Sequence, residues 1–179
     1  MGQANQAAPV LSILAAFSRH EQALAWARET AEAHWGPMAL ASPAFEFTET
    51  EYYTTTMGAG LKKQFFAFEQ LIDPARLVDF KLQSNQWEAQ YAALEKHAEL
   101  RPLNLDPGYI TLAKLVLAST KDHSHRIYLG RGIFAEITLS FRSGGWQPSE
   151  WTYPDYRRAD FQRFFDDCRA YLKGIGGKR

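Results

Sequence analysis

The feature that most constrains this chain is a short apolar run, residues 9–17, that passes directly into an amphipathic stretch. A run of this length, rich in aliphatic side chains and free of charge, predicts a buried β-strand. Ser18 and Glu21 then match the capping box that starts a helix. Apolar side chains follow with the spacing of one helix face, at Leu24, Ala27, Ala31 and Trp35. Gly36-Pro37 ends that helix, so the chain opens with a strand–helix unit.

β-prone runs and helix signals follow this unit. Residues 45–53 and 62–68 are rich in aromatic side chains and predict two strands. Asp73 is a suitable N-cap and Pro74 a suitable first helical residue, so a short helix is expected to begin there. A second helical stretch, residues 84–100, carries aromatic and aliphatic side chains at spacings of four and three.

The middle of the chain is harder to assign to one type of element. Residues 104–107 are expected to be a turn or a strand end, because Asp-Pro-Gly disfavours regular structure. The apolar stretch 109–118 permits a short helix or a strand. Leu112, Leu115 and Val116 have the i, i+3, i+4 spacing, which favours the helix.

Two hairpins and a helix complete the predicted elements. Residues 126–129 and 133–141 flank a Gly-Arg-Gly turn, and residues 143–145 form a second turn. The middle strand alternates, and one of its faces consists of Ile133, Ala135, Ile137 and Leu139. The stretch 158–173 then carries the apolar stripe of a final helix.

This order of elements predicts an α+β fold. We expect a mainly antiparallel sheet with helices packed on it, built as a ferredoxin-like core plus an extra hairpin and a C-terminal helix. One domain is expected over residues 9–179, after a loose tail at residues 1–8.

Charge and cysteine content narrow the classes of function. The formal net charge is zero, from 20 Lys and Arg against 20 Asp and Glu, which argues against a duplex-DNA binder. The only cysteine, Cys168, excludes an internal disulfide and favours a reducing compartment. It lies in the apolar stripe of the last helix, where a thiol is expected to be buried and inert. No apolar stretch approaches the roughly 20 residues that span a bilayer, so a cytoplasmic location without membrane contact is expected.

Motifs for the common nucleotide and hydrolase sites are missing. The sequence has no phosphate-binding P-loop, no complete dinucleotide fingerprint and no G-x-S-x-G elbow. No motif indicates a particular cofactor, which stays unknown. His123 and His125, two residues apart, could share a metal with Asp122. No third or fourth ligand follows at a recognisable spacing, so no metal site is predicted.

The densest polar segment is residues 121–126, where an apolar run passes into a hairpin. Lys121, His125 and Arg126 offer charge-assisted hydrogen bonds to an anion, and Lys114 joins them if the segment 109–118 folds back. Two turns that combine acidic and aromatic residues would complete a pocket, through Asp106, Tyr153 and Asp155. The leading hypothesis is therefore a protein that binds a phosphorylated or otherwise anionic ligand, such as a nucleotide or single-stranded RNA.

Two other functions remain open from the sequence. A hydrolase or transferase would use His125 as general acid–base, oriented by Asp106 or Asp122. A non-enzymatic adaptor would dock a protein partner on exposed aromatic side chains. In the purely structural alternative, Lys121 and Asp122 belong to a solvated loop, and His125 and Arg126 bond neighbouring carbonyl groups.

Five longer motifs carry a resemblance to a known family. The main motif is residues 104–129, NLDPGYITLAKLVLASTKDHSHRIYL, and the others are Tyr52-Tyr53 before Met57-Gly58, FFAFEQLIDP at 65–74, GIFAEITL at 132–139 and WTYPDY at 151–156. In these motifs the chain resembles an uncharacterised bacterial and archaeal family, catalogued as domain of unknown function 4416. Its members are sometimes labelled GTP-binding, a label that the missing phosphate loops do not support. The family pattern has an aromatic residue more often than His at position 123, which favours His125 and Arg126 as site residues.

Overall fold

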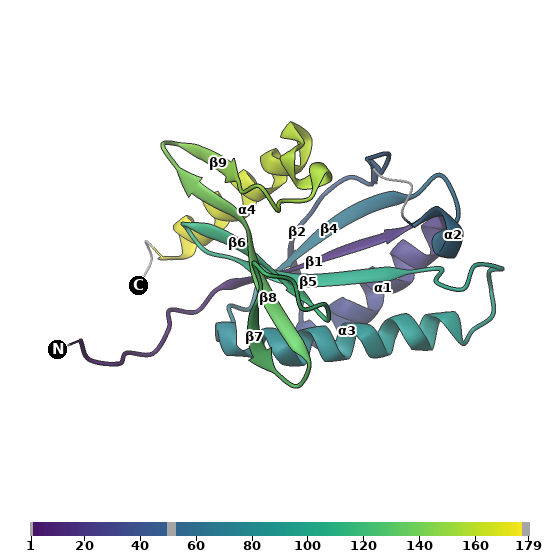
Figure 1. Ribbon diagram of the computed structural model, residues 1–179, viewed down its shortest axis with the longest axis horizontal. Helices are drawn as coiled ribbons and strands as arrows, with labels where there is room; N and C mark the ends of the chain where they lie inside the picture. The colour runs from purple at the N-terminus through teal and green to yellow at the C-terminus, as the bar shows by residue number, and fades with distance from the viewer. Residues whose placement is uncertain (1, 50–52, 177–179) are drawn as a thin grey trace.

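The computed structural model describes residues 2–49 and 53–176, so Tyr52 lies outside the described residues (Figure 1). The described elements, in chain order, are β1 (Leu11–Ser18), α1 (Glu21–Trp35), β2 (Met38–Ala41), β3 (Phe45–Glu46), α2 (Thr54–Met57), β4 (Lys62–Phe68), the 3₁₀ turn η1 (Pro74–Arg76), α3 (Leu77–Ala92), β5 (Asn104–Ile110), β6 (Lys114–Ser119), β7 (Ile127–Gly130), β8 (Ile133–Arg142), β9 (Gly145–Pro148), the 3₁₀ turn η2 (Pro154–Arg157) and α4 (Ala159–Gly176). Each of these helices is too short or too polar to cross a membrane.

The strands form one antiparallel sheet in the order β2-β4-β1-β5-β6-β8-β7, with β3 beside β4 and β9 beside β8. Four neighbouring strands of this sheet, β2, β4, β1 and β5, form a ferredoxin-like core with α1 and α3. Along the chain these elements have the β-α-β-β-α-β order of that fold, and the strands have its neighbours. The α+β prediction is therefore confirmed. The strands β6 to β9 continue the same sheet beyond that core.

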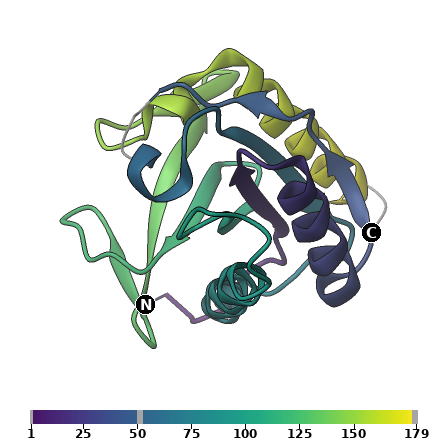
Figure 2. The ribbon, with the colours of Figure 1, turned by 90° about the vertical axis from the view of Figure 1, so that its right-hand side faces the viewer.

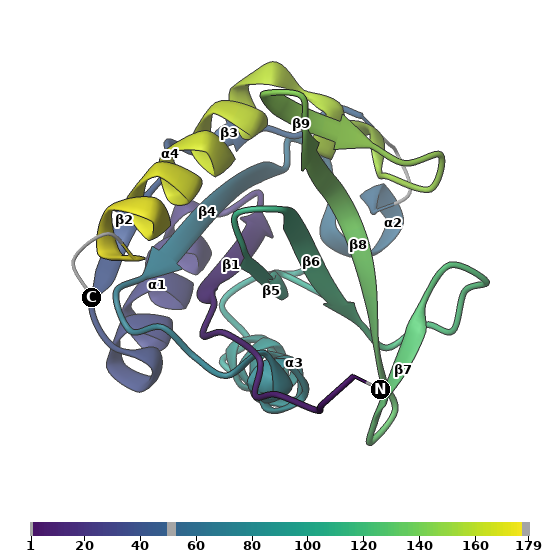
Figure 3. The ribbon, with the colours of Figure 1, turned by 90° about the vertical axis from the view of Figure 1, so that its left-hand side faces the viewer.

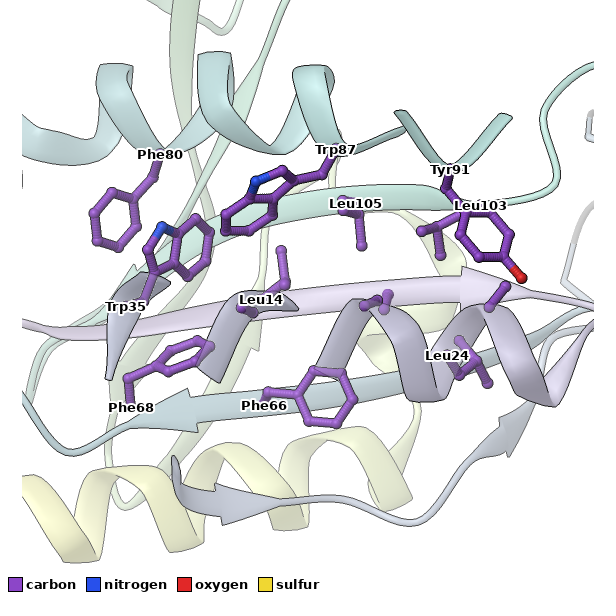
Figure 4. Close-up of a cluster of buried hydrophobic side chains, with 14 of the residues drawn as sticks. Leu14, Leu24, Trp35, Phe66, Phe68, Phe80, Trp87, Tyr91, Leu103 and Leu105 are labelled. Atoms are coloured by element: carbon purple, nitrogen blue, oxygen red, sulfur yellow. The ribbon is translucent and has the colours of Figure 1, made fainter. Parts of the chain in front are cut away.

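One face of the sheet is covered by α1 and α3. Leu14 and Phe66 point from the strands into this layer, where Trp35 of α1 stacks on Phe80 of α3 with ring centroids 4.1 Å apart (Figure 4). The predicted stripe of α1 is buried, and Gly36 has the positive φ of 93° that glycine tolerates at a helix end.

The opposite face is covered by α4, as Figure 3 shows. Neighbouring strand residues alternate between the two faces, so Ile13 packs under α4 while Leu14 packs under α1 and α3. All eight residues of β1 are buried for this reason, which confirms the predicted buried strand. Cys168 also lies in the α4 layer, where burial raises the pKa of its thiol.

The sheet splits between β5 and β6. All seven residues of β5 pair with β1, but only three, Gly108 to Ile110, pair with β6. A Cβ at Gly108 would lie 2.4 Å from the Val116 carbonyl oxygen, so only glycine permits this close approach of the strands. Pro107, the first residue beyond the pairing, has no N–H to offer a neighbour. The strands then diverge.

A bulge in β8 changes which of its side chains are buried. Leu115 pairs with Leu139 and the next β6 residue, Val116, pairs with Ile137, so Thr138 is an extra residue. The predicted single apolar face is therefore wrong: Ile137 is 40% exposed, while Glu136 and Thr138 are buried.

Several predicted elements differ from the structure because tertiary contacts outweigh local signals. Ser18 is the last residue of β1 and not an N-cap, since its hydroxyl donates to the Pro102 carbonyl oxygen, 2.5 Å away, and accepts from the His20 N–H. The segment 104–107 lies inside β5 and is no turn.

Three further boundaries are corrected. The stretch 109–118 is not a helix, because it forms the hairpin between β5 and β6. The two predicted helical stretches after Asp73 join through η1 into α3, which ends at Ala92. Of the described residues in the predicted strand 45–53, which leave out 50–52, only Phe45 and Glu46 are strand, and β2 was not predicted.

We expect Gly108→Ala to lower the free energy of unfolding by about 2 kcal/mol, because the new methyl group forces β5 and β6 apart. Gly145→Ala is the matched control, since a Cβ there meets no atom within 4 Å. Urea denaturation of both variants tests this; equal midpoints would contradict the close approach.

Candidate functional site

A cavity of about 1020 Å³ opens where β5 and β6 diverge. Its lining includes Asn104 and Asp106 of β5 and Leu117 to Ser119 of β6. Side chains of α3 form a second wall, and η2 with the residue before it, Tyr153, forms a third. Figure 2 shows the end of the molecule with α3 seen end-on below the sheet. The cavity therefore lies inside the fold and is framed mainly by regular elements.

Two charged side chains of α3 take the place of the missing strand partner of β5. The Leu105 N–H donates to Glu88 Oε1 over 2.7 Å, and Lys81 Nζ donates to the Leu105 carbonyl oxygen over 2.8 Å. Burial raises the pKa of the Glu88 carboxyl, against the opposing effects of Lys81 and the Leu105 N–H. These bonds satisfy a strand edge that would otherwise lack partners.

A chain of polar side chains continues along β5 toward the solvent. Lys81 Nζ lies 3.3 Å from Asp106 Oδ1, and the Asn104 amide donates to Asp106 Oδ2 over 2.9 Å. Arg101 in turn donates to the Asn104 side-chain oxygen. The Arg101 side chain is 43% exposed, so it lies at the mouth of the cavity.

A buried ion pair forms the inner wall. Lys63 Nζ lies 2.5 Å from Asp155 Oδ2, and both side chains are at most 5% exposed. The same ammonium lies 4.9 Å from the ring centroid of Phe17, 5.2 Å from that of Phe47 and 4.7 Å from that of Tyr156. Aromatic faces and a carboxylate together compensate the loss of water around this charge.

Tyr156 brings an unsatisfied hydroxyl to the cavity. Among the described residues its buried OH has no hydrogen-bond partner, although the residue is only 2% exposed. Burial raises its pKa well above the usual value, and the nearby carboxylates Asp155, Asp106 and Glu136 raise it further. Burial and Asp106 likewise raise the pKa of Tyr53. Both phenols therefore stay protonated and are able to donate a hydrogen bond.

Arg126 builds the outer wall. Its Nε donates to Glu136 Oε2 over 2.8 Å, and its terminal nitrogens donate to Ser119 Oγ at 2.7 Å, to the Lys121 carbonyl oxygen at 3.0 Å and to Tyr153 OH at 3.0 Å. The Arg126 and Glu136 side chains are each 2% exposed. Nearly every donor of this guanidinium thus has a partner in the protein, so Arg126 positions the wall and Tyr153.

The structure brings five of the predicted site residues to one cavity: Asp106, Lys121, Arg126, Tyr153 and Asp155. His123, considered above as a metal ligand, also lines it. Among the described residues no group of three His, Cys, Asp or Glu side chains is arranged to hold a metal. The roles assigned to these residues stay predictions.

Three predicted residues lie elsewhere. His125 does not line the cavity; its Nε2 is 3.1 Å from Glu136 Oε2, and its ring stacks on Trp151 with centroids 5.2 Å apart. Asp122 is exposed. Lys114 pairs with Ser140 at the other end of β6, away from the cavity.

Sequence reasoning missed the side chains that make up the interior of the cavity: Lys63, Lys81, Glu88, Glu136 and Tyr156. One signal was present. Lys81 and Glu88 are seven residues apart, which places them on one face of a helix, and that face also carries apolar residues that pack on the sheet. The bulge that turns Glu136 inward left no signal in the sequence.

We expect Lys81→Met to lower the free energy of unfolding by about 2–3 kcal/mol, because it leaves a buried carbonyl oxygen without its donor. Lys96→Met, at an exposed lysine, is the matched control and should leave the urea midpoint unchanged. Equal stability of the two variants would contradict the role of Lys81 as the hydrogen-bond donor that replaces a neighbouring strand at Leu105.

Comparison with known proteins identifies the family but no characterised relative. No curated protein and no solved structure matches the chain. A family model described as "Domain of unknown function (DUF4416)" matches residues 8–171, which include every strand described above and all the walls of the cavity. The chain belongs to the DUF4416 family.

Proposed function

We propose that the protein binds a small ligand with an anionic group, such as a phosphate, in the cavity between β5 and β6. The observation that carries this proposal is a cavity of about 1020 Å³ whose lining includes many polar and charged side chains, with cationic ones at its mouth. Ligand pockets commonly have volumes of about 300–1,000 Å³ and a few convergent polar groups. Because the chain has a single cysteine, we place the protein in the reducing cytoplasm as part of this proposal.

Arg101 and Lys121 are the side chains proposed to hold the anion. Continuing the β5–β6 register past the split would place Asn104 opposite Lys121, so the chains entering β5 and leaving β6 flank the same opening. Both side chains line the cavity, and each is exposed or partly exposed. A guanidinium has five N–H donors, so Arg101 can bind an oxyanion while it donates to Asn104 and lies 3.7 Å from Glu88 Oε2.

The sequence predicted that Arg126 binds the anion, but in this proposal Arg126 has a positioning role. Its donors bond Glu136, Ser119 and neighbouring oxygens, so an anion at Arg126 would displace protein contacts. We assign to Arg126 the positioning of Tyr153 and of the segment that carries Lys121. Loss of Arg126 would then disturb the fold as well as the binding.

The catalytic alternative receives less support from the geometry. His125 bonds Glu136 and not Asp106 or Asp122, and it lies outside the cavity lining. A general base must reach the proton that it abstracts, directly or through one water. A binding function needs no such residue.

A thermal-shift screen with inorganic phosphate, phosphosugars and nucleotides tests the proposal. A ligand at 100 times its Kd adds about 2.7 kcal/mol to stability, which gives a clear shift. We expect the double variant Arg101→Ser, Lys121→Ser to bind phosphate-bearing probes on the order of a hundredfold more weakly, since two charge-assisted hydrogen bonds are lost.

Arg142→Ser, Lys173→Ser is the matched control, because it removes the same charges at exposed positions outside the cavity lining. It should bind the probes like the unmodified protein. If no phosphate-bearing probe binds, or if both double variants bind equally, the proposal fails.

A further inference from the structure

We propose that the inner end of the ligand is an uncharged, hydroxyl-rich group, so that the ligand class is a phosphorylated sugar or polyol. This inference rests on the proposed function and specifies which half of the ligand each part of the cavity recognises. The anion stays at the mouth, and the hydroxyl groups enter the split between β5 and β6.

The charges inside the cavity favour a neutral group there. Lys63 is paired with Asp155 at 2.5 Å, and Lys81 contacts Asp106 at 3.3 Å. A second anion at the inner end would approach these carboxylates, and a ligand ammonium would approach the lysines. Because the side chains of the Lys63–Asp155 pair are at most 5% exposed, little water is present there to screen either repulsion. An uncharged polar group meets neither penalty.

The hydrogen-bonding groups inside fit hydroxyls. The buried Tyr156 OH is a donor without a partner among the described residues, and Tyr156 lines the cavity together with the carboxylates Asp155, Asp106 and Glu136. A ligand hydroxyl can accept from the phenol and donate its own proton to a carboxylate. A group that only donates or only accepts would leave one of these partners unsatisfied.

Most aromatic rings near the cavity are poorly placed to stack a nucleobase. Tyr53 packs on Phe17 with ring centroids 5.1 Å apart and on Phe47 at 6.0 Å, and Phe47 is 8% exposed. Trp151, which is 39% exposed, stacks on His125 and does not line the cavity. A base attached to the ligand could reach only the ring of Tyr153, which is 42% exposed and whose hydroxyl accepts from Arg126 at the outer wall, so the base would add little affinity.

Titration calorimetry with ribose 5-phosphate, glucose 6-phosphate, inorganic phosphate and adenosine monophosphate tests this inference. We expect at least one sugar phosphate to bind tenfold or more tightly than inorganic phosphate, and adenosine monophosphate to bind no more tightly than ribose 5-phosphate. Inorganic phosphate binding as tightly as both sugar phosphates would overturn the inference, as would tightest binding of adenosine monophosphate together with binding of adenosine alone.

Tyr156→Phe gives a second, independent readout. Removing the hydroxyl should weaken binding of the sugar phosphate roughly five- to tenfold and leave binding of inorganic phosphate unchanged. In the free protein the same change removes a buried unsatisfied group, so the urea midpoint should rise. Ser12→Ala is the control, because the Ser12 hydroxyl is also buried without a partner among the described residues but lies outside the cavity lining, so only stability should change.

The two proposals fail in different ways. If Tyr156→Phe leaves sugar phosphate binding intact while Arg101→Ser, Lys121→Ser abolishes it, the anion site stands and the hydroxyl site is wrong. If none of the phosphate-bearing probes binds, the proposed function itself is lost.

Discussion

The whole site depends on how the backbone of β5 is satisfied beyond its last pair with β6. A strand edge inside a protein carries N–H and C=O groups that need partners, and a sheet normally supplies them with the next strand. Here Glu88 and Lys81 supply them from α3, at Leu105, while Pro107 has no N–H that needs one. Charged side chains replace a β-ladder, and the sheet can open without leaving these groups unsatisfied.

The electrostatics of the cavity follow from that replacement. A buried lysine is stable only beside a carboxylate or aromatic rings, so Lys81 contacts Asp106, and Lys63 pairs with Asp155 inside a ring of aromatic side chains. Each cation in the interior thus has a carboxylate near it. The result is a polar interior with little net charge and a mouth at which Arg101 is partly exposed.

The elements that could be predicted are those whose local pattern agrees with their tertiary surroundings. The buried run of β1 and the stripe of α1 are strong signals of this kind, and they fix the start of the ferredoxin-like core. A helix was favoured for the stretch 109–118 of the β5–β6 hairpin, because apolar residues buried on both faces of a strand have no period of two. The local composition of the segment does not reveal that it pairs with a neighbouring strand.

The site was predictable in its outline and not in its chemistry. The segments around Asp106, Lys121 and Asp155 combine polar residues in a way that the sequence displays. Lys81 depends on a helix face and Glu136 on a strand bulge, both of which are set by packing partners far away in the chain. A single charged residue in a strand is otherwise read as solvent-facing.

The split also joins two parts of the molecule that the sheet keeps separate. The layer beneath α3 and the layer beneath α4 share no helix, and α3 contributes Lys81 and Glu88 to one wall of the cavity while η2 contributes Asp155 and Tyr156 to another. A molecule lodged between these walls would bridge the two layers through the sheet. Amide hydrogen exchange in α1 and in α4, which lie on opposite faces, would then slow together on binding, so that two regions able to open independently become one cooperative unit.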